Sequence, residues 1–228
     1  MKLFVIEGVD GSGKSTQLKM LSDFITRKGH KCEFLHFPRT DAPYFGELIA
    51  RFLRGEFGSL NAVDPYLVAL LYAGDRNDAS GMIREWLEQK KIVLLDRYTY
   101  SNIAYQCAKI DDREVRENLM KWILTLEFDH FGIPKPDLNF FLDVPFSFTE
   151  NKLSSHRSGN DRSYLNGTRD IHEESLNFQK RVRDIYLEVA RRDDRLCVVE
   201  CRDKNGLMQT PDAISNLILK IIIEKELI

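Results

Sequence analysis

The chain has 228 residues, of which 43% are hydrophobic and 30% charged, values that are typical of a soluble globular protein. Its formal net charge of −2 argues against a bulk electrostatic attraction to nucleic acid or to an anionic membrane. No apolar run approaches the length of a membrane span. From the net charge and the absence of such a run, we expect neither a nucleic-acid partner nor a membrane partner.

Five short apolar runs predict β-strands along the chain, at residues 2–6, 32–37, 92–95, 138–142 and 196–199. Helical patterns separate these runs, for example at residues 47–53 and 80–89, and Gly29 is expected to end the first helix. Near-continuous apolar strands that alternate with helices indicate a parallel sheet covered on both faces. We therefore predict an α/β fold with a five-stranded parallel sheet, in a single domain that spans residues 1–228.

A glycine-rich segment follows the first predicted strand and matches the phosphate-loop pattern G-x-x-x-x-G-K-[ST]. It consists of Gly8, Val9, Asp10, Gly11, Ser12, Gly13, Lys14, Ser15 and Thr16. Its glycines let consecutive backbone N–H groups converge on one phosphate, and the start of the following helix favours an anion. We expect Lys14 to reach the β- and γ-phosphates of ATP and the Ser15 hydroxyl to ligate Mg²⁺.

The third predicted strand ends on a carboxylate, Asp96, which Arg97 and Tyr98 follow directly. In phosphate-loop proteins a carboxylate at this strand end contacts Mg²⁺ through water. Asp96 and Arg97 should both lie at the sheet edge that carries the phosphate loop, because the strands are predicted to be parallel.

A polar segment at residues 151–170 interrupts the alternation of strands and helices, and it contains Arg157, Arg162 and Arg169. Loops over a phosphate site often close on substrate, and arginine suits phosphate because of its forked donors. We expect this segment to form an arginine-containing lid.

Several short motifs, in order along nearly the whole chain, resemble those of the thymidylate kinases. They are Phe4 to Asp10 before the phosphate loop, Phe37-Pro38-Arg39, Leu70 to Arg76, Asp96-Arg97-Tyr98 with Ser101 to Gln106, Pro134 to Leu138, and Tyr164 to Gly167. Each motif is weak alone, but their order and spacing are specific. The resemblance implies a P-loop kinase that uses Mg²⁺ and transfers the γ-phosphoryl group of ATP to dTMP. The products would be ADP and dTDP, for dTTP synthesis, and family members are usually homodimers.

The resemblance also implies contacts with the sugar and the acceptor phosphate. Asp10 would face the 3′-hydroxyl of dTMP or the metal, and Tyr105 would crowd the sugar and disfavour a 2′-hydroxyl. Phe37 would also belong to the dTMP-binding residues. Arg39, in the same motif, and Arg97 would hold the acceptor phosphate, because an arginine fork binds phosphate bidentately.

Four further residues would contact the base. Tyr72 lies where the family usually has a Phe under the thymine ring, and Tyr164 would close the pocket from the lid side. Arg76 would donate to thymine O4, and Asn102 would lie near N3. Cytosine carries an amino donor in place of O4, so a donor from Arg76 would be left unpaired by it.

One departure concerns Gly11, because some members carry a basic residue directly after the phosphate-loop Asp. The resemblance implies that members with Gly at that position supply arginines from the lid instead. Arg157 and Arg162 fit that arrangement. Catalysis would then rest on charge neutralisation by Mg²⁺, Lys14, Arg97 and the lid arginines, without a general base. Glu173 or Glu174 could assist the metal or the sugar, and the residues do not decide between them.

Two alternatives remain open from the residues. Another P-loop deoxynucleotide or deoxynucleoside kinase shares most of these motifs, although Arg39 would be idle without an acceptor phosphate. A GTP-binding switch is suggested by the segment Asn151 to Ser154, which resembles the guanine-reading N-K-x-D, but Ser154 replaces the required Asp.

The chain has four cysteines, Cys32, Cys107, Cys197 and Cys201. No histidine cluster accompanies Cys197 and Cys201, so reduced thiols are expected rather than a zinc site. No signal peptide precedes the first predicted strand, and we expect a cytoplasmic protein.

Overall fold

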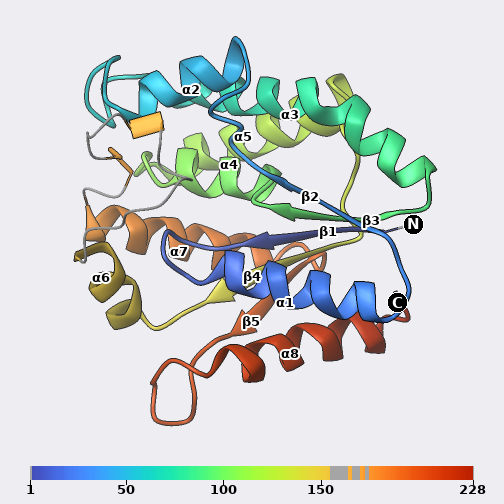
Figure 1. Ribbon diagram of the computed structural model, residues 1–228. Coiled ribbons are helices and arrows are strands. Elements are labelled where there is room, and N and C mark those ends of the chain that lie inside the picture. The colour runs from blue at the N-terminus through green and yellow to red at the C-terminus, as the bar shows by residue number, and fades with distance from the viewer. Residues whose placement is uncertain (1, 155–163, 166–169, 173–174, 228) are drawn as a thin grey trace.

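The computed structural model describes residues 2–154, 164–165, 170–172 and 175–227, and it forms one parallel sheet with helices on both faces (Figure 1). The strands are β1 (Lys2–Glu7), β2 (Cys32–His36), β3 (Ile92–Asp96), β4 (Leu138–Asp143) and β5 (Leu196–Glu200). The helices are α1 (Lys14–Arg27), α2 (Phe45–Leu53), α3 (Pro65–Glu88), α4 (Thr99–Cys107), α5 (Arg113–Leu124), η1 (Thr125–His130), α6 (Phe146–Ser154), α7 (Leu176–Ala190) and α8 (Pro211–Glu224). The predicted five-stranded sheet is confirmed, and each strand ends within one residue of its predicted end.

The strand order is β2-β3-β1-β4-β5, and every neighbouring pair is parallel. From β1 at the centre the chain moves first to β2 and β3 on one side and then to β4 and β5 on the other. Ligands of such sheets bind outside the carboxyl end of the strand at which this direction changes. Because Ile6 pairs with Asp96, the segments that follow β1 and β3 begin side by side at that edge.

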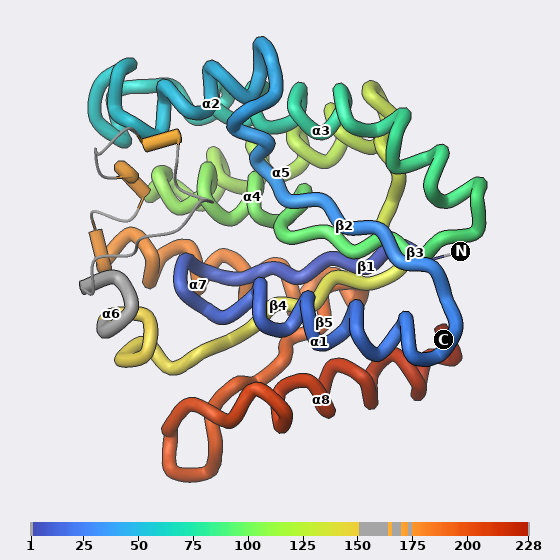
Figure 2. The backbone as a smooth tube through the Cα atoms, viewed as in Figure 1, coloured from blue at the N-terminus to red at the C-terminus, as the bar shows by residue number. Residues whose placement is uncertain are grey.

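The alternation of side chains along β1 divides the core between two layers. Phe4 and Ile6 pack in one cluster with Leu18 and Leu21 of α1. Leu3 and Val5 pack in another with Ile83 of α3. Both faces of the sheet are therefore covered, which explains the near-continuous apolar strands. Figure 2 shows α8 lying beside α1 along one face of the molecule.

Local signals account for several helix boundaries. Gly29 has a left-handed φ of 84°, and its N–H donates to Thr26 O at 2.9 Å just beyond the end of α1, as predicted. Asp64 caps α3 by accepting a hydrogen bond from Tyr66 N at 2.8 Å, and Pro65 occupies the first turn. Within the described residues, no helix combines the length and the apolar character needed to cross a membrane.

Candidate active site

The phosphate loop wraps the start of α1 at the carboxyl end of β1. Gly11 and Gly13 have left-handed φ values of 77° and 89°, a conformation that glycine adopts without steric penalty. Lys14 is buried, and its Nζ donates to the loop carbonyl of Val9 at 3.2 Å, so the ammonium lies across the loop. Ser15 is exposed on the first turn of α1 and lines a nearby cavity.

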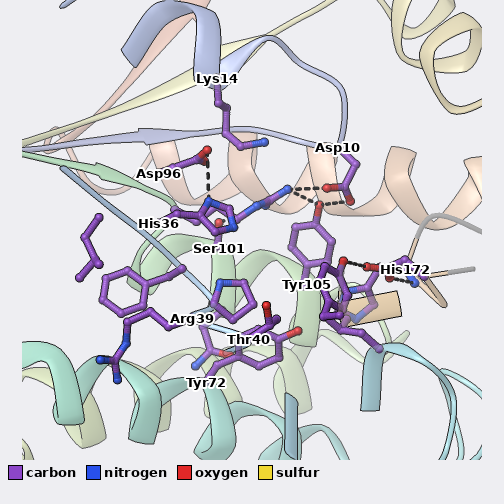
Figure 3. A pocket seen from close by; sticks show the side chains of 18 of the residues that line it. Asp10, Lys14, His36, Arg39, Thr40, Tyr72, Asp96, Ser101, Tyr105 and His172 are labelled. Atoms are coloured by element: carbon purple, nitrogen blue, oxygen red, sulfur yellow. Dashed lines mark hydrogen bonds and ion pairs between the residues drawn. The ribbon is translucent and has the colours of Figure 1, made fainter. Parts of the chain in front are cut away.

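A cavity of about 660 Å³ opens beside this loop (Figure 3). Most of the predicted site residues line it together: Asp10, Gly11, Lys14, Ser15, Phe37, Arg39, Tyr72, Arg76, Asp96, Arg97, Asn102, Tyr105 and Tyr164. Gly8, Val9, Ser12, Gly13 and Thr16 belong to the phosphate loop but do not line this cavity. The volume suits a small organic ligand such as a nucleotide. Residues from the phosphate loop, β2, α3, β3 and α4 therefore converge on one space.

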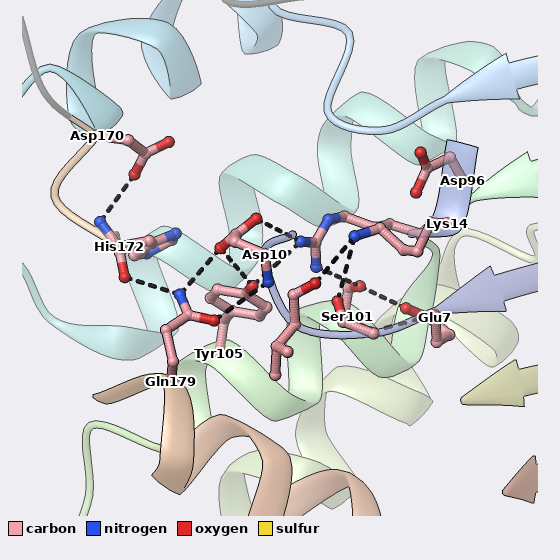
Figure 4. Close-up of polar contacts among 12 residues, drawn as sticks. Glu7, Asp10, Lys14, Asp96, Ser101, Tyr105, Asp170, His172 and Gln179 are labelled. Carbon is pink, nitrogen blue, oxygen red and sulfur yellow. Dashed lines mark hydrogen bonds and ion pairs between the residues drawn. The ribbon is translucent and has the colours of Figure 1, made fainter. Parts of the chain in front are cut away.

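The Asp10 carboxylate is held by three side chains from different elements (Figure 4). It accepts hydrogen bonds from Arg97 Nη2 at 2.7 Å, from Tyr105 OH at 2.7 Å and from Gln179 Nε2 at 2.9 Å. Burial alone would raise the pKa of Asp10, but the charges of Arg97 and Lys14 outweigh burial and hold that pKa well below its ordinary value. Asp10 is therefore a carboxylate whose negative charge is balanced inside the site.

Arg97 is fixed in position by its backbone and by its neighbours. Its φ of 66° is left-handed, which is uncommon for a residue with a side chain. Its Nη1 donates to Ser101 Oγ at 3.3 Å, and its guanidinium lies 5.0 Å from the centre of the Tyr105 ring. Ser101 in turn donates to the buried Glu7. Arg97 is thus presented to the cavity beside Lys14 and Asp96.

Arg39 is bound to two carboxylates of α3. Its Nε donates to Asp75 Oδ1 at 2.8 Å, and its Nη2 donates to Asp78 Oδ2 at 2.5 Å. The Arg39 backbone N–H also donates to Asp75 Oδ2, at 2.9 Å. Asp75 therefore anchors the motif that begins at Phe37, and two of the three guanidinium nitrogens of Arg39 are engaged.

Arg76 and Asn102 both line the cavity and are almost fully buried. Arg76 donates through Nε and Nη2 to Glu127, at 2.7 and 2.6 Å. Asn102 Nδ2 donates to Glu127 Oε1 and to Ala69 O, each at 3.0 Å, and no described residue donates to Asn102 Oδ1. Glu127 was not predicted to belong to the site, and its carboxylate accepts hydrogen bonds from both residues.

Aromatic residues form much of the remaining wall. Tyr72 is buried among residues of α2 and α3, and burial holds its pKa well above the ordinary value, so the ring is neutral. Tyr164 donates to Asp170 Oδ2 at 2.8 Å and accepts at its carbonyl from Arg54 Nη1 at 2.8 Å. Phe37 packs on Tyr98 with ring centres 5.7 Å apart. These flat apolar surfaces suit an aromatic base.

Two further groups were missed by sequence reasoning. His172 is buried between Tyr105 and Phe178, with ring centres 5.0 and 5.7 Å away, and no described residue bonds its Nε2. Burial holds the pKa of His172 well below its ordinary value, so the ring is neutral near pH 7. Gln179 of α7 bridges Asp10 and the carbonyl of His172. Neither residue lies in a recognisable motif.

The surroundings of Asp96 bear on whether it can serve a Mg²⁺ ion. Asp96 Oδ1 is buried, and no described residue bonds it, while Oδ2 lies 3.3 Å from His36 Nδ1. Burial alone would raise the pKa of Asp96, but Lys14 and His36 together lower it, so the group is a carboxylate. A buried carboxylate oxygen that no described residue bonds, in a cavity that an exposed serine also lines, fits the oxygen ligands that Mg²⁺ prefers.

Some predictions lie outside the described residues. Arg157, Arg162 and Arg169, which carry the lid hypothesis, are among them, as are Glu173 and Glu174. The described part of the predicted lid segment comprises the end of α6, residues 164–165 and Asp170.

Comparisons with known proteins agree with this arrangement. The family model described as thymidylate kinase matches residues 6–210. The thymidylate kinase of Mycobacterium tuberculosis is 34% identical over 189 residues, which cover 82% of this chain and 85% of that protein. A probable thymidylate kinase of Thermococcus kodakarensis is 30% identical over 223 residues, covering 96% of this chain and 95% of the relative.

A solved structure supports the same assignment. The thymidylate kinase of Candida albicans superposes with a TM-score of 0.70 at 27% identity, covering 99% of this chain and 92% of that one. The shared sheet, the phosphate loop and the match over most of the sequence show that this chain belongs to the thymidylate kinase family.

Proposed function

We propose that the protein transfers the γ-phosphoryl group of ATP to dTMP and releases dTDP and ADP. The observation that carries this proposal is the single cavity that runs from Lys14 and Ser15 to Arg76 and Asn102. A nucleoside monophosphate in this cavity would have its phosphate beside the phosphate loop and its base at the far end. The two substrates would then meet in line, which is what phosphoryl transfer requires.

The polar groups at the far end match the edge of thymine. Asn102 Oδ1 is an acceptor without a described partner, and it suits the N3–H of thymine. Arg76 uses Nε and Nη2 on Glu127, which leaves Nη1 as the donor for O4. Cytosine offers an acceptor at N3 and a donor at position 4, so both contacts would be mismatched. Tyr72 would stack on the base.

The acceptor phosphate would bind between Arg97 and Arg39. Arg97 lies next to the phosphate loop. Carboxylates of α3 hold Nε and Nη2 of Arg39, and no contact of Nη1 is seen among the described residues. Asp10 would face the sugar, with Tyr105 beside it, and its hydrogen bonds would keep both groups in place. An acceptor phosphate is already an anion, so no side chain needs to remove a proton from it.

Charge neutralisation would supply the catalysis. Lys14 and the backbone N–H groups of the loop would bind the ATP phosphates, and Arg97 would meet charge on the transferred group. We propose that Ser15 holds Mg²⁺ directly and that Asp96 holds it through water. When bound, Mg²⁺ would screen the β- and γ-phosphate oxygens. The lid arginines Arg157 and Arg162 would complete this positive surface.

The oligomeric state and the cellular location are also proposals. We propose a homodimer, as is usual in the family, and α3 exposes Leu67, Leu70 and Met82, which would be available for such a contact. We propose a cytoplasmic location, because all four cysteines are free thiols, as expected in a reducing compartment.

The test is coupled ADP release with dTMP, dUMP, dCMP and thymidine as acceptors. We expect dTMP to exceed dCMP in kcat/KM by at least roughly 100-fold, because the base pocket would leave its polar groups unpaired with cytosine. Thymidine should be a poor acceptor, because Arg39 and Arg97 would have no phosphate to bind. Equal rates with dTMP and dCMP would contradict the base assignment, and efficient thymidine phosphorylation would indicate a nucleoside kinase.

A further inference from the structure

Glu127 lies on η1, is fully buried and accepts hydrogen bonds from three side chains, of which Arg76 and Asn102 line the cavity. Oε1 accepts from Arg76 Nη2 at 2.6 Å and from Asn102 Nδ2 at 3.0 Å. Oε2 accepts from Arg76 Nε at 2.7 Å and from Thr99 Oγ1 at 2.7 Å. All four contacts are donors to the carboxylate, and each of its two oxygens accepts two of them.

Glu127 supplies the negative charge that balances the buried Arg76 guanidinium. Arg76 is 1% exposed, and an isolated guanidinium at such a depth would be strongly destabilising. Burial alone would lower the pKa of Arg76, and the adjacent Glu127 carboxylate outweighs that effect and raises it. The bidentate geometry also fixes the plane of the guanidinium, because two parallel bonds leave little rotational freedom.

Glu127 also fixes the orientation of the Asn102 side chain. The Asn102 amide could in principle present either its oxygen or its NH₂ group to the cavity. Its Nδ2 faces two acceptors, Glu127 Oε1 and Ala69 O, which fixes the amide nitrogen on that side and leaves the buried Oδ1 on the other. Oδ1 is left without a bond from any described residue. Glu127 therefore decides that Asn102 offers an acceptor, while Arg76 offers a donor beside it.

The backbone at Glu127 is unusual in a way that serves this placement. Residues 125–130 form a π-helical turn that continues α5, with Phe131 N donating to Leu126 O at 2.8 Å across five residues. Single π-helical turns occur mostly within α-helices and frequently at functional sites, since the wider turn changes where the following side chains point. Here the turn carries Glu127 against α3 and α4, which supply Arg76 and Asn102.

We propose that Glu127 is a positioning residue for base selection: its carboxylate sets the donor and acceptor pattern of Arg76 and Asn102, and thereby selects a 4-oxo, 3-NH pyrimidine over a 4-amino pyrimidine. This inference rests on the proposed function. Glu127 does not line the cavity, and it would act through Arg76 and Asn102, which do.

The test is the substitution Glu127→Gln, with kcat and KM measured for dTMP and dCMP. Glutamine has one acceptor oxygen, so its NH₂ group must face a donor of Arg76, and the bidentate contact is lost. Base contacts act equally in the ground and transition states, so KM for dTMP should rise at least about tenfold while kcat changes by less than about threefold. The preference for dTMP over dCMP in kcat/KM should fall at least about tenfold.

A matched control is Asp143→Asn. Asp143 is also buried and is also held bidentately by an arginine, Arg183, but it lies on β4 and does not line the cavity. Loss of a buried ion pair as such would affect both variants, whereas the ratio of dTMP to dCMP should change only in Glu127→Gln. Thermal denaturation of each variant shows whether it is folded.

Thr99→Val is the second variant, because it keeps both charges and removes only one donor to Glu127. It should lower the dTMP preference by about two- to tenfold, the loss expected for one hydrogen bond. It decides the question if Glu127→Gln does not fold.

The outcomes separate the two proposals. If the parent enzyme shows no preference for dTMP, the proposed function is wrong. If the parent prefers dTMP and the folded Glu127→Gln variant keeps both its KM and its preference, the role of Glu127 is wrong. The role of Glu127 is also wrong if only kcat falls in Glu127→Gln. If Glu127→Gln cannot be folded, the role is wrong when Thr99→Val retains the parental preference for dTMP.

Discussion

Arg97 Nη2 donates to Asp10 Oδ1 across 2.7 Å, so the residue that follows β3 neutralises a carboxylate inside the phosphate loop. The two positions are 87 residues apart in sequence. A carboxylate at this place would repel the phosphates of ATP if its charge were not balanced. The contact therefore explains how the loop tolerates Asp10, and it also links the ATP side of the site to the acceptor side.

We predict that Asp10→Asn lowers kcat on dTMP at least about tenfold, because a charge-assisted hydrogen bond is replaced by a neutral one beside the acceptor. ATP affinity should change little, because the backbone of the loop and Lys14 are unaltered. Calorimetry for ATP and steady-state turnover measure the two effects. Asp23→Asn, at an exposed position of α1, serves as control and should behave like the parent. Near-parental turnover of Asp10→Asn would mean that Asp10 only shapes the loop.

We predict that Asp96→Asn raises the Mg²⁺ concentration needed for half-maximal activity by roughly 10- to 100-fold, the usual effect of losing an outer ligand partner. The reason is that Asp96 is ionised, with one buried oxygen that no described residue bonds. Turnover at saturating ATP and dTMP, measured against free Mg²⁺, checks this. An unchanged Mg²⁺ requirement would show that Asp96 is bound only to His36.

We predict that Arg157→Ala and Arg162→Ala each lower kcat strongly and change KM for dTMP little, because these contacts would form mainly in the transition state. An arginine supplied at this step can be worth roughly 10³–10⁵ in turnover, and two arginines that share the role should each give the lower part of that range or less. Arg162→Lys should recover part of the rate, since lysine lacks the fork. A double Ala variant that turns over like the parent at saturating substrates would disprove the lid hypothesis.

We predict a pH-dependent stabilisation from Lys109→Met. Burial lowers the pKa of Lys109 from its ordinary value of 10.5 to about 7, and its Nζ lies 4.8 Å from the centre of the Phe52 ring. Between these pH values the unfolded chain binds more protons at this position than the folded chain, so the parent gains stability as pH rises. Below about pH 7 the full cost of burying the charge is present.

The methionine variant has no such charge. Its stability advantage over the parent should therefore be largest below about pH 7 and should shrink towards pH 10. Urea denaturation of both proteins at about pH 6.5 and about pH 9.5 gives the difference in unfolding free energy at each pH. A difference that stays constant, or that grows with pH, would contradict the lowered pKa.

The amino-acid sequence by itself determined the sheet and the phosphate loop. Strands such as β3 appear as uninterrupted apolar runs because both sides of the sheet are covered, and the loop appears as glycines and a lysine at fixed spacing because short-range backbone geometry demands them. Asp96 and Arg97 were placed correctly for the same reason, since the end of a buried strand predicts a position at the sheet edge.

Only the tertiary structure decided which partners those residues have. Glu127 meets Arg76 from 51 residues away, and Gln179 meets Asp10 from 169 residues away. Neither contact has a local signal, because each depends on how η1 or α7 packs against other elements of the fold. A buried carboxylate and its arginine are recognised only when burial and distance are known, and a sequence pattern contains neither quantity.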